Sequence, residues 1–364
     1  MKVPTQPDRV NVSFRRDRFA VFLPNMTAEK LHNGISRRGF VAGSLAMPFL
    51  SNGVNAQDAF GEILSKAESY DQLHSISLSV AGNTVFEQAI RGAALSRAVN
   101  VKSVSKTLLA TLTLIALDKG VLSSVDQPIL PILGSMAPTG LDQRTQKITI
   151  DHLLTMRSGL ERTSGGNYGA WVSSNNWVRY ALTRPMQATP GARMIYSTGD
   201  YHLLSAVLTQ ASGRSTLALA NEWLARPMGF EFAAWTRDPQ GIYMGGNNMN
   251  LSPRNMVRIG EMVLQGGKVD GVQVVSNSRL KDAWTPRTRS PFSGHQYGYG
   301  WFLTEMAGMR VGFARGYGGQ MIYVIPKARA VLAITSDPTR PARSAGYAGI
   351  LNRLLENDIL PKLA

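Results

Sequence analysis

Residues 101–109 read Val101-Lys102-Ser103-Val104-Ser105-Lys106-Thr107-Leu108-Leu109, with a serine and a lysine three positions apart. Apolar residues recur at helical spacing after them, and Asp118-Lys119-Gly120 supplies a stop, so the pattern predicts a helix that begins near Ser103. Residues three apart share one face of a helix, which brings the hydroxyl and the amine close together.

Two interpretations of Ser103 are open. A first-turn serine commonly caps its helix, its hydroxyl accepting a hydrogen bond from a backbone N–H two or three residues on. Lys106 favours a chemical role, because the helix dipole disfavours a cation in the first turn and such violations are typical of functional sites. The dipole and burial would also push the amine toward its neutral form, which can accept the serine proton.

The 364 residues carry a formal net charge of +15. Residues 1–56 hold eight Lys/Arg and three Asp/Glu, so they contribute +5 and leave +10 for the rest. No run of Lys/Arg is interleaved with aromatic residues, so we expect solvated basic surface and no nucleic-acid partner. The chain has no cysteine, which excludes disulfides, lipobox lipidation and thiolate metal sites.

The segment Ser36-Arg37-Arg38-Gly39-Phe40-Val41 resembles a twin-arginine export signal. A weakly apolar run, residues 41–50, and the small-residue site Val54-Asn55-Ala56 follow it. Ten residues are too few to span a bilayer as a helix, so no stable membrane anchor is expected. We expect residues 1–56 to be an export signal with an N-terminal extension, read by the export machinery, and the mature protein to be periplasmic or secreted. The alternative is a chance arginine pair.

The remaining chain alternates between helical and strand periodicity. Helices are expected at Ala59–Leu73, Asn255–Gln265, Asn277–Trp284 and Ser344–Leu355, and residues 108–244 are mostly helical, with loops at Pro128–Pro138, Ser164–Tyr168 and Pro185–Gly191. Strands are expected at Ser75–Val80, Thr84–Ile90, Tyr297–Thr304, Met309–Ala314, Gln320–Ile325 and Ala330–Thr335.

These elements predict an α/β (α+β) architecture in which the early hairpin and the late strands form one antiparallel sheet flanked by helices. Residues 57–364 form one domain, with 107–245 as an inserted, mostly helical lobe and 57–106 plus 246–364 as the sheet lobe. Ser103 falls at the junction, where clefts form.

Several other catalytic arrangements are missing from the sequence. There is no Gly-x-Ser-x-Gly elbow, His-Glu-x-x-His helix, phosphate loop or dinucleotide fingerprint. The five histidines lack metal-ligand spacing, so neither a metal nor a cofactor is expected. His152 is expected to cap or pack a helix and His202 to lie within one, which makes a histidine base the less favoured interpretation.

Four ordered landmarks carry a family resemblance. They are Ser103-Val104-Ser105-Lys106, residues 148–160 (Ile-Thr-Ile-Asp-His-Leu-Leu-Thr-Met-Arg-Ser-Gly-Leu), residues 190–200 (Pro-Gly-Ala-Arg-Met-Ile-Tyr-Ser-Thr-Gly-Asp) and residues 315–320 (Arg-Gly-Tyr-Gly-Gly-Gln). From about Phe60 to the C-terminus the chain resembles the serine β-lactamase and penicillin-binding superfamily, class C-like branch. It looks closest to the 6-aminohexanoate-dimer hydrolase and esterase group, which implies a β-lactamase-like fold and an acyl-enzyme.

The resemblance also implies roles for individual residues. Ser103 would be the acylated nucleophile, Lys106 its base, and Tyr196 the phenol that relays a proton to the leaving group. Beside a lysine cation, Tyr196 is expected to have a lowered pKa; the alternative is a packed aromatic near a Pro-Gly turn. The backbone N–H groups of Ser103 and Gln320 would form the oxyanion hole.

Substrate contacts are expected at Tyr317, Gly318 and Gly319, because glycines let a substrate approach the backbone; a β-bulge is the alternative. Tyr168 is either a lid residue or part of a plain exposed loop. Asn247 is expected to line the pocket.

Two departures from the β-lactamase pattern bear on the substrate. Thr198 stands where β-lactamases have asparagine, and Tyr317 where they have lysine or the related esterases histidine. Both missing groups would help to bind a β-lactam, so we expect a serine hydrolase of small esters or amides, provided that Arg315 or another arginine in the cleft does not replace the lost cation. The alternatives are a β-lactamase or DD-peptidase, and a non-catalytic binding module of the same fold.

Overall fold

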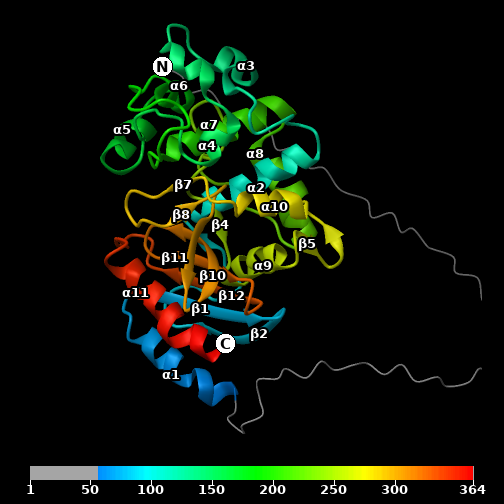
Figure 1. Cartoon of the computed structure of the whole chain (residues 1–364), viewed down its shortest axis with the longest axis vertical. Coiled ribbons are helices and arrows are strands. Elements are labelled where there is room, and N and C mark those ends of the chain that lie inside the picture. The colour runs from blue at the N-terminus through cyan, green and yellow to red at the C-terminus, as the bar shows by residue number, and fades with distance from the viewer. Residues whose placement is uncertain (1–55, 364) are drawn as a thin grey trace, which may run out of the picture. The chain divides into compact units, whose positions relative to one another are not determined.

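The computed structural model describes residues 56–363 (Figure 1). The twin-arginine segment and the apolar run after it lie outside the described residues, so the export prediction stays a prediction. Within the described part, no helix is long and apolar enough to cross a membrane.

One antiparallel sheet of eight strands organises the molecule, in the order β2-β1-β12-β11-β10-β9-β8-β7. The early hairpin therefore pairs with the last strand, with Ile76 opposite Ile334, and the predicted single sheet is confirmed. The strands are β1 (Leu73–Val80), β2 (Asn83–Ala89), β7 (Thr288–Arg289), β8 (Gln296–Tyr297), β9 (Phe302–Met306), β10 (Met309–Gly316), β11 (Gln320–Ile325) and β12 (Ala330–Ser336).

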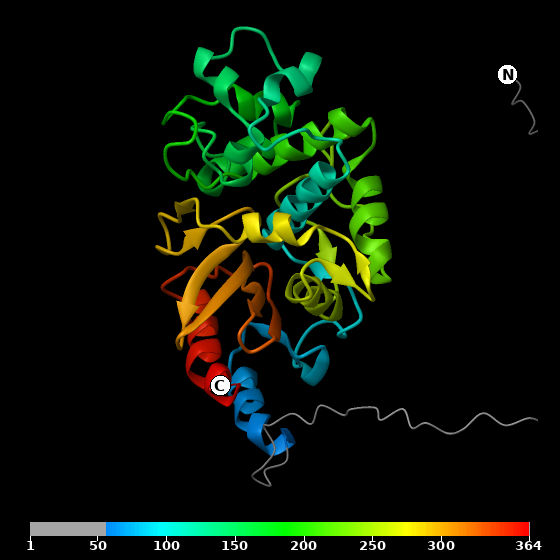
Figure 2. The same ribbon diagram turned by 45° about the vertical axis from the view of Figure 1, so that its right-hand side comes forward.

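Both faces of the sheet are covered, which is why every residue of β11 and β12 is buried. Helices α1 (Ala56–Glu68) and α11 (Tyr347–Arg353) lie side by side at one end of the molecule (Figures 1 and 2). On the other face α9 (Pro253–Leu264) packs on β11 and β12, and its Gly260 lies against Val331 and Val324, where a β-carbon would clash.

Helix α2 (Val104–Asp118) runs between the sheet and the remaining helices (Figure 2). All its residues from Val104 to Leu117 are buried, because it contacts β10 and β11 as well as α7 (Thr198–Ser212). The other helices are α3 (Ile129–Leu133), α4 (Ile150–Leu154), α5 (Tyr168–Val172), α6 (Trp177–Leu182), α8 (Thr216–Leu219) and α10 (Asn277–Ala283). The division of the chain at residues 107 and 245 stays a prediction.

Short strands that the sequence did not predict join distant segments. Strand β3 (Val99–Asn100) pairs with β4 (Asn250–Leu251). This pairing places the segment just before Ser103 beside the segment just after Asn247. Strands β5 (Lys268–Val269) and β6 (Val272–Gln273) form a small separate hairpin.

Several predicted boundaries were wrong. The strand expected at 297–304 is split into β8 and β9, since Gly300, at a φ of +77°, turns the chain so that it packs against Ala110 of α2. The first helix ends at Glu68, and the last one begins at Tyr347 and continues as a π-helical turn over Leu354–Ile359. The loop expected at 128–138 contains α3, because Ile129 and Leu133, four apart, are both buried.

Candidate active site

Ser103 occupies the position just before α2, where two features of the backbone hold it. Lys102 has a φ of +50°, and its N–H donates to Asn100 Oδ1 at 2.9 Å. Gly316, at the end of β10, lies directly against Val101, where a β-carbon would clash with the carbonyl oxygen. The Ser103 hydroxyl makes no capping hydrogen bond, so the simple capping interpretation is wrong.

Lys106 lies one turn further into α2, and its side chain is buried, with 2% exposed. Its Nζ lies 3.1 Å from Ser103 Oγ and 3.3 Å from Thr198 Oγ1, and donates to the Gly246 carbonyl at 2.7 Å. Burial lowers the pKa of Lys106 to about 7, while the charge of Asp200 acts in the opposite direction. A large fraction of the amine is therefore neutral near neutral pH and able to accept the Ser103 proton.

Asp200, in the first turn of α7, is a buried carboxyl for which the sequence predicts no role. Burial raises its pKa to about 7, and a hydrogen bond from Ser158 and the charge of Lys106 offset only part of that effect. Its Oδ1 accepts from Ser158 Oγ at 3.0 Å, whereas Oδ2 has no hydrogen-bond partner among the described residues. The sequence signal that could have revealed Asp200 is an acidic residue in a helical segment whose other residues are mostly apolar or uncharged.

Tyr196 lies next to this pair, but not in the expected electrostatic state. Lys106 Nζ lies over the face of the Tyr196 ring, 4.9 Å from its centroid. Burial raises the pKa of Tyr196, and a hydrogen bond with Ser103 and the charge of Arg315 offset it only in part. The prediction of a lowered pKa was therefore wrong, and Tyr196 remains a protonated phenol, which can donate a proton.

Gln320, the predicted second oxyanion donor, begins β11 opposite Gly316. Its side chain is buried and held away from the site, because Nε2 donates to Ser336 O at 2.6 Å and Oε1 accepts from Ser336 N at 3.2 Å. Only its backbone is available for a catalytic role. The role of the two backbone N–H groups stays a prediction.

The glycines of the same turn have a structural explanation. Gly318 and Gly319 have φ values of +85° and +94°, and β-carbons there would clash with Asp337 and Tyr347. The pairing of β10 with β11 ends at Gly316 and Gln320, so both the substrate-contact and the bulge interpretations of Gly318 and Gly319 stay predictions. Tyr317 protrudes from the turn with 51% of its surface exposed.

Tyr168 and Asn247 lie together although 79 positions separate them. Asn247 Nδ2 donates to the Tyr168 hydroxyl at 3.3 Å, and Asn247 Oδ1 is buried without a partner among residues 56–363. Asn247 directly follows Gly246, the acceptor for Lys106, so both residues lie near the site. A lid movement of Tyr168 stays a prediction.

The histidines take structural positions. His152 Nδ1 accepts from Thr149 N at 3.2 Å and completes a capping box at α4, as predicted. His202 is fully buried and bonds to Asp238 at 3.0 Å. Among the described residues, no cluster of three or more His, Asp or Glu side chains could hold a metal ion.

A cavity in the described part of the chain lies away from the chemistry. A cavity of about 770 Å³ lies between α9, α10 and the hairpin turns, and none of Ser103, Lys106 and Tyr196 lines it. A smaller cavity of about 370 Å³ is lined by Tyr196. We assign the site to the Ser103–Lys106 pair, because a nucleophile within reach of a buried amine identifies reactive chemistry more directly than cavity size does.

Comparisons with known proteins agree with this geometry. A family model described as Beta-lactamase matches residues 97–356. The D-alanyl-D-alanine-carboxypeptidase/endopeptidase AmpH of Escherichia coli (strain K12) is 28% identical over 153 residues, so the match spans 40% of this chain and only 38% of that relative.

Solved structures share the fold. A putative 6-aminohexanoate-dimer hydrolase from Bacillus anthracis superposes with a TM-score of 0.66 at 17% identity over 80% of each chain. A family VIII carboxylesterase gives a TM-score of 0.66 at 15% identity, over 83% of this chain and 95% of the other. The predicted β-lactamase-like fold is thereby confirmed.

Proposed function

The chain belongs to the beta-lactamase family and is a serine hydrolase, and from this premise we propose that it cleaves small esters or linear amides through an acyl-enzyme on Ser103. The observation that carries the proposal is the 3.1 Å approach of the buried Lys106 amine to the Ser103 hydroxyl. A neutral amine at this distance is a general base within hydrogen-bond reach of the nucleophile.

The reaction follows from the residues around that pair. Ser103 Oγ attacks the substrate carbonyl carbon as its proton passes to Lys106, and the backbone N–H groups of Ser103 and Gln320 stabilise the oxyanion. The protonated phenol of Tyr196 gives a proton to the leaving atom as its bond to carbon breaks. Water then adds to the acyl carbon, one of its protons returns to Ser103 Oγ, and the carboxylic acid departs. The proton that Lys106 took from Ser103 passes to the Tyr196 phenolate, which restores the neutral amine and the protonated phenol.

The preference for esters or linear amides rests on the missing cation at Tyr317. The exposed phenol there supplies no positive charge for a β-lactam carboxylate. A carboxylate left without its partner in a partly desolvated cleft loses roughly 2 to 5 kcal/mol of binding. A DD-peptidase activity is the second candidate, and the similarity to a D-alanyl-D-alanine-carboxypeptidase/endopeptidase over part of the chain favours it.

We also propose that the protein is exported through the segment around Arg37 and Arg38. The support is the order of arginine pair, apolar run and small-residue site in the sequence. The mass of protein recovered from the periplasm is expected to correspond to a chain that begins at Gln57, and unprocessed cytoplasmic protein would contradict the proposal.

Covalent labelling tests the enzymatic proposal against a non-catalytic binding module. Purified protein is treated with a fluorophosphonate probe, and Ser103→Ala is expected to lose both labelling and hydrolysis of a nitrophenyl ester. The unfolding free energy should change by no more than about 1 kcal/mol, since the hydroxyl makes no capping bond. Ser65→Ala, on the exposed side of α1, is the matched control. Labelling that persists without Ser103 would exclude it as the nucleophile.

A further inference from the structure

The amine of Lys106 has three oxygen atoms within hydrogen-bond distance. Ser103 Oγ lies 3.1 Å from Nζ, Thr198 Oγ1 lies 3.3 Å from it, and the Gly246 carbonyl oxygen lies 2.7 Å from it. A neutral amine has two N–H groups and one lone pair, and only the lone pair can accept the Ser103 proton. Because a carbonyl oxygen can only accept, one N–H must point to Gly246. The direction of the Thr198 hydroxyl therefore decides where the lone pair points.

The hydrogen atoms around the amine can be arranged in two ways. If Thr198 Oγ1 accepts the second N–H, the lone pair is left for the Ser103 hydroxyl. If the Thr198 hydroxyl instead donates to the lone pair, the second N–H turns to Ser103 Oγ, and the amine cannot act as its base. A hydroxyl can both donate and accept, so the other partner of Thr198 fixes the choice.

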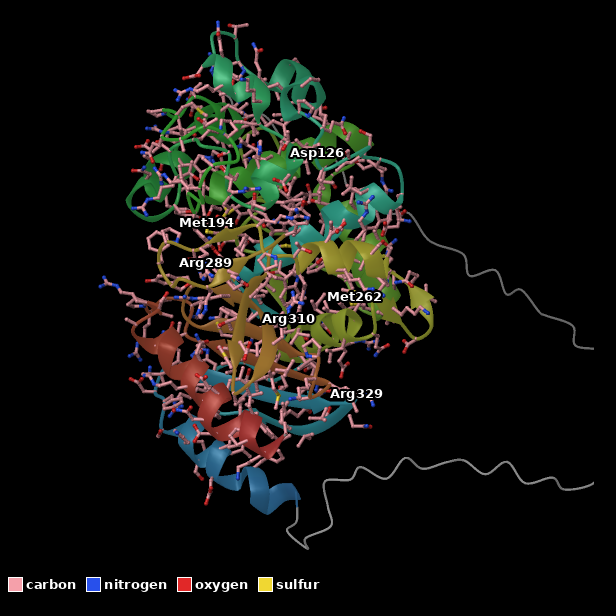
Figure 3. All side chains as sticks on the ribbon, viewed as in Figure 1. Asp126, Met194, Met262, Arg289, Arg310 and Arg329 are labelled. Carbon is pink, nitrogen blue, oxygen red and sulfur yellow. The ribbon has the colours of Figure 1, made fainter. Side chains whose placement is uncertain are left out.

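Ser164 is that other partner. The two hydroxyl oxygens lie 2.9 Å apart, and the Thr198 backbone N–H also donates to Ser164 Oγ, at 2.8 Å. A hydroxyl oxygen has two lone pairs, so Ser164 Oγ can accept from both the N–H and the O–H of Thr198. Its own hydrogen can then reach solvent, because Ser164 is only partly buried, whereas Thr198 is 4% exposed. The chain enters α7 from the boundary between the helical end of the molecule and the sheet, where Figure 3 labels Met194.

The same serine also has a structural function at the start of α7. Ser197, the residue before the helix, makes no capping bond with its side chain. The first backbone N–H groups bond instead to a distant segment, Thr198 N to Ser164 Oγ and Gly199 N to Thr163 Oγ1 at 2.7 Å. Thr163 thus caps the helix as Ser164 does, but the bonds of its hydroxyl go to Gly199 and Ser197 and not to Thr198 Oγ1.

We propose that Ser164 is a positioning residue for the reaction. By accepting the hydroxyl hydrogen of Thr198, it makes Thr198 Oγ1 an acceptor for Lys106 and so directs the amine lone pair at Ser103. The inference rests on the proposed function, since it assigns Ser164 through the role of Lys106 as the base. Ser164 lies outside the four sequence landmarks, because its bond with Thr198 joins residues 34 positions apart.

A double-mutant cycle tests this assignment. Ser164→Ala should lower kcat/KM for a nitrophenyl ester by about tenfold, because the Thr198 hydroxyl then donates to the lone pair and competes with Ser103. In a Thr198→Val background, which has no hydroxyl at this position, adding Ser164→Ala should cause no further loss. Ser164→Thr keeps the acceptor and should keep a value near that of the wild type. The rate of labelling by the fluorophosphonate probe should follow the same pattern, since labelling needs an activated Ser103.

Thr163→Val is the matched control for the capping function. It removes the hydroxyl that caps Gly199 but keeps the pair of Ser164 and Thr198, so it should destabilise the protein as Ser164→Ala does while kcat/KM stays near the wild-type value. Ser164→Cys, whose sulfur accepts only weakly, should lose less activity than Ser164→Ala. It takes the place of the alanine variant in the cycle if that variant does not fold.

The outcomes separate this inference from the proposed function. No loss in Ser164→Ala, an equal loss in the wild-type and Thr198→Val backgrounds, or an equal loss in Thr163→Val would show that Ser164 is at most a cap. Each of these results would overturn the inference and leave the proposed function intact. Absence of ester hydrolysis and of Ser103 labelling in the wild type would refute the proposed function, and this inference with it.

Discussion

Helix α7 carries a buried carboxyl, Asp200, and a buried imidazole, His202, whose surroundings differ sharply. His202 Nε2 bonds to Asp238 Oδ2 at 3.0 Å, and Asp238 Oδ1 accepts backbone N–H groups from Gln240 and Ile242 at 3.0 and 2.8 Å. Asp238 is thus fully satisfied. Asp200, two residues earlier, has one satisfied oxygen and one without a partner in the described chain, and Lys106 has no carboxylate in contact.

The contact between His202 and Asp238 stabilises the fold, whereas the buried groups around Lys106 are arranged for reaction. Trp171 and Trp177 pack their rings edge-on against His202, so packed side chains enclose its bond to Asp238, although His202 Nδ1 has no hydrogen-bond partner among the described residues. Around Lys106 the partners are neutral oxygens of Ser103, Thr198 and Gly246, which leaves burial uncompensated and lowers the amine pKa. Buried groups with shifted pKa values are typical of functional sites, whereas satisfied pairs are typical of cores.

The largest expected effect comes from removing the amine. Lys106→Met should lower kcat/KM for a nitrophenyl ester by about 10⁴-fold or more, because the loss of one residue of a catalytic unit removes most of the rate enhancement of the whole unit. Its stability should stay equal or rise, since an apolar chain of similar length replaces a buried amine that is partly charged near neutral pH. Ester kinetics and thermal unfolding measure both effects. Turnover close to wild type would show that Lys106 is structural.

The opposite pattern is expected at the His202–Asp238 pair. His202→Ala should lower the unfolding free energy by about 3 kcal/mol, because it leaves Asp238 Oδ2 unpaired and opens a cavity against two tryptophans. Under conditions where the variant is folded, its kcat/KM should stay near the wild-type value, which denaturant titration and ester kinetics together would show. His202→Gln, which keeps a donor, should lose less stability. A loss of activity without a loss of stability would place His202 in the catalytic unit.

The sequence predicted those parts of the structure that local patterns specify. Ser103 and Lys106 were found because three positions of helix separate them, and the hairpins because short turns join alternating strands. The Lys106 contacts with Thr198 and Gly246 join residues 92 and 140 positions apart, so no local period could reveal them. The break between β8 and β9 was missed for the same reason, since it depends on Ala110 packing against Gly300.

Asp200 should influence the pH dependence of the reaction through the pKa of Lys106. The reactive Lys106 is neutral, so kcat/KM is expected to rise with pH through about 7. The charge of Asp200 raises the Lys106 pKa, and Asp200→Asn should therefore move this rise to lower pH. Asp118→Asn, at the far end of α2, should leave the profile in place. A shift to higher pH, or none, would contradict the coupling.

The same substitution has a predicted effect on stability. Because burial raises the Asp200 pKa from its ordinary value to about 7, folding is favoured while the carboxyl is protonated. The contribution is complete below about pH 4 and is lost as pH rises through about 7. Asp200→Asn should remove that loss, so its unfolding free energy should exceed that of the wild type at pH 8 and approach it at pH 4. Urea unfolding at the two pH values measures the difference.

The smallest effect is expected where a charge is added in contact with solvent. Tyr317 is half exposed, so a lysine there costs little desolvation and interacts more weakly than the buried Lys106 does. Tyr317→Lys should raise kcat/KM for benzylpenicillin relative to that for a nitrophenyl ester by roughly tenfold, while the ester stays the better substrate. Tyr317→Gln removes the phenol without adding charge, and should leave that ratio near the wild-type value. If the wild type already hydrolyses penicillin as efficiently as the ester, the missing cation is not what limits the reaction, and the β-lactamase alternative becomes the better description of this site.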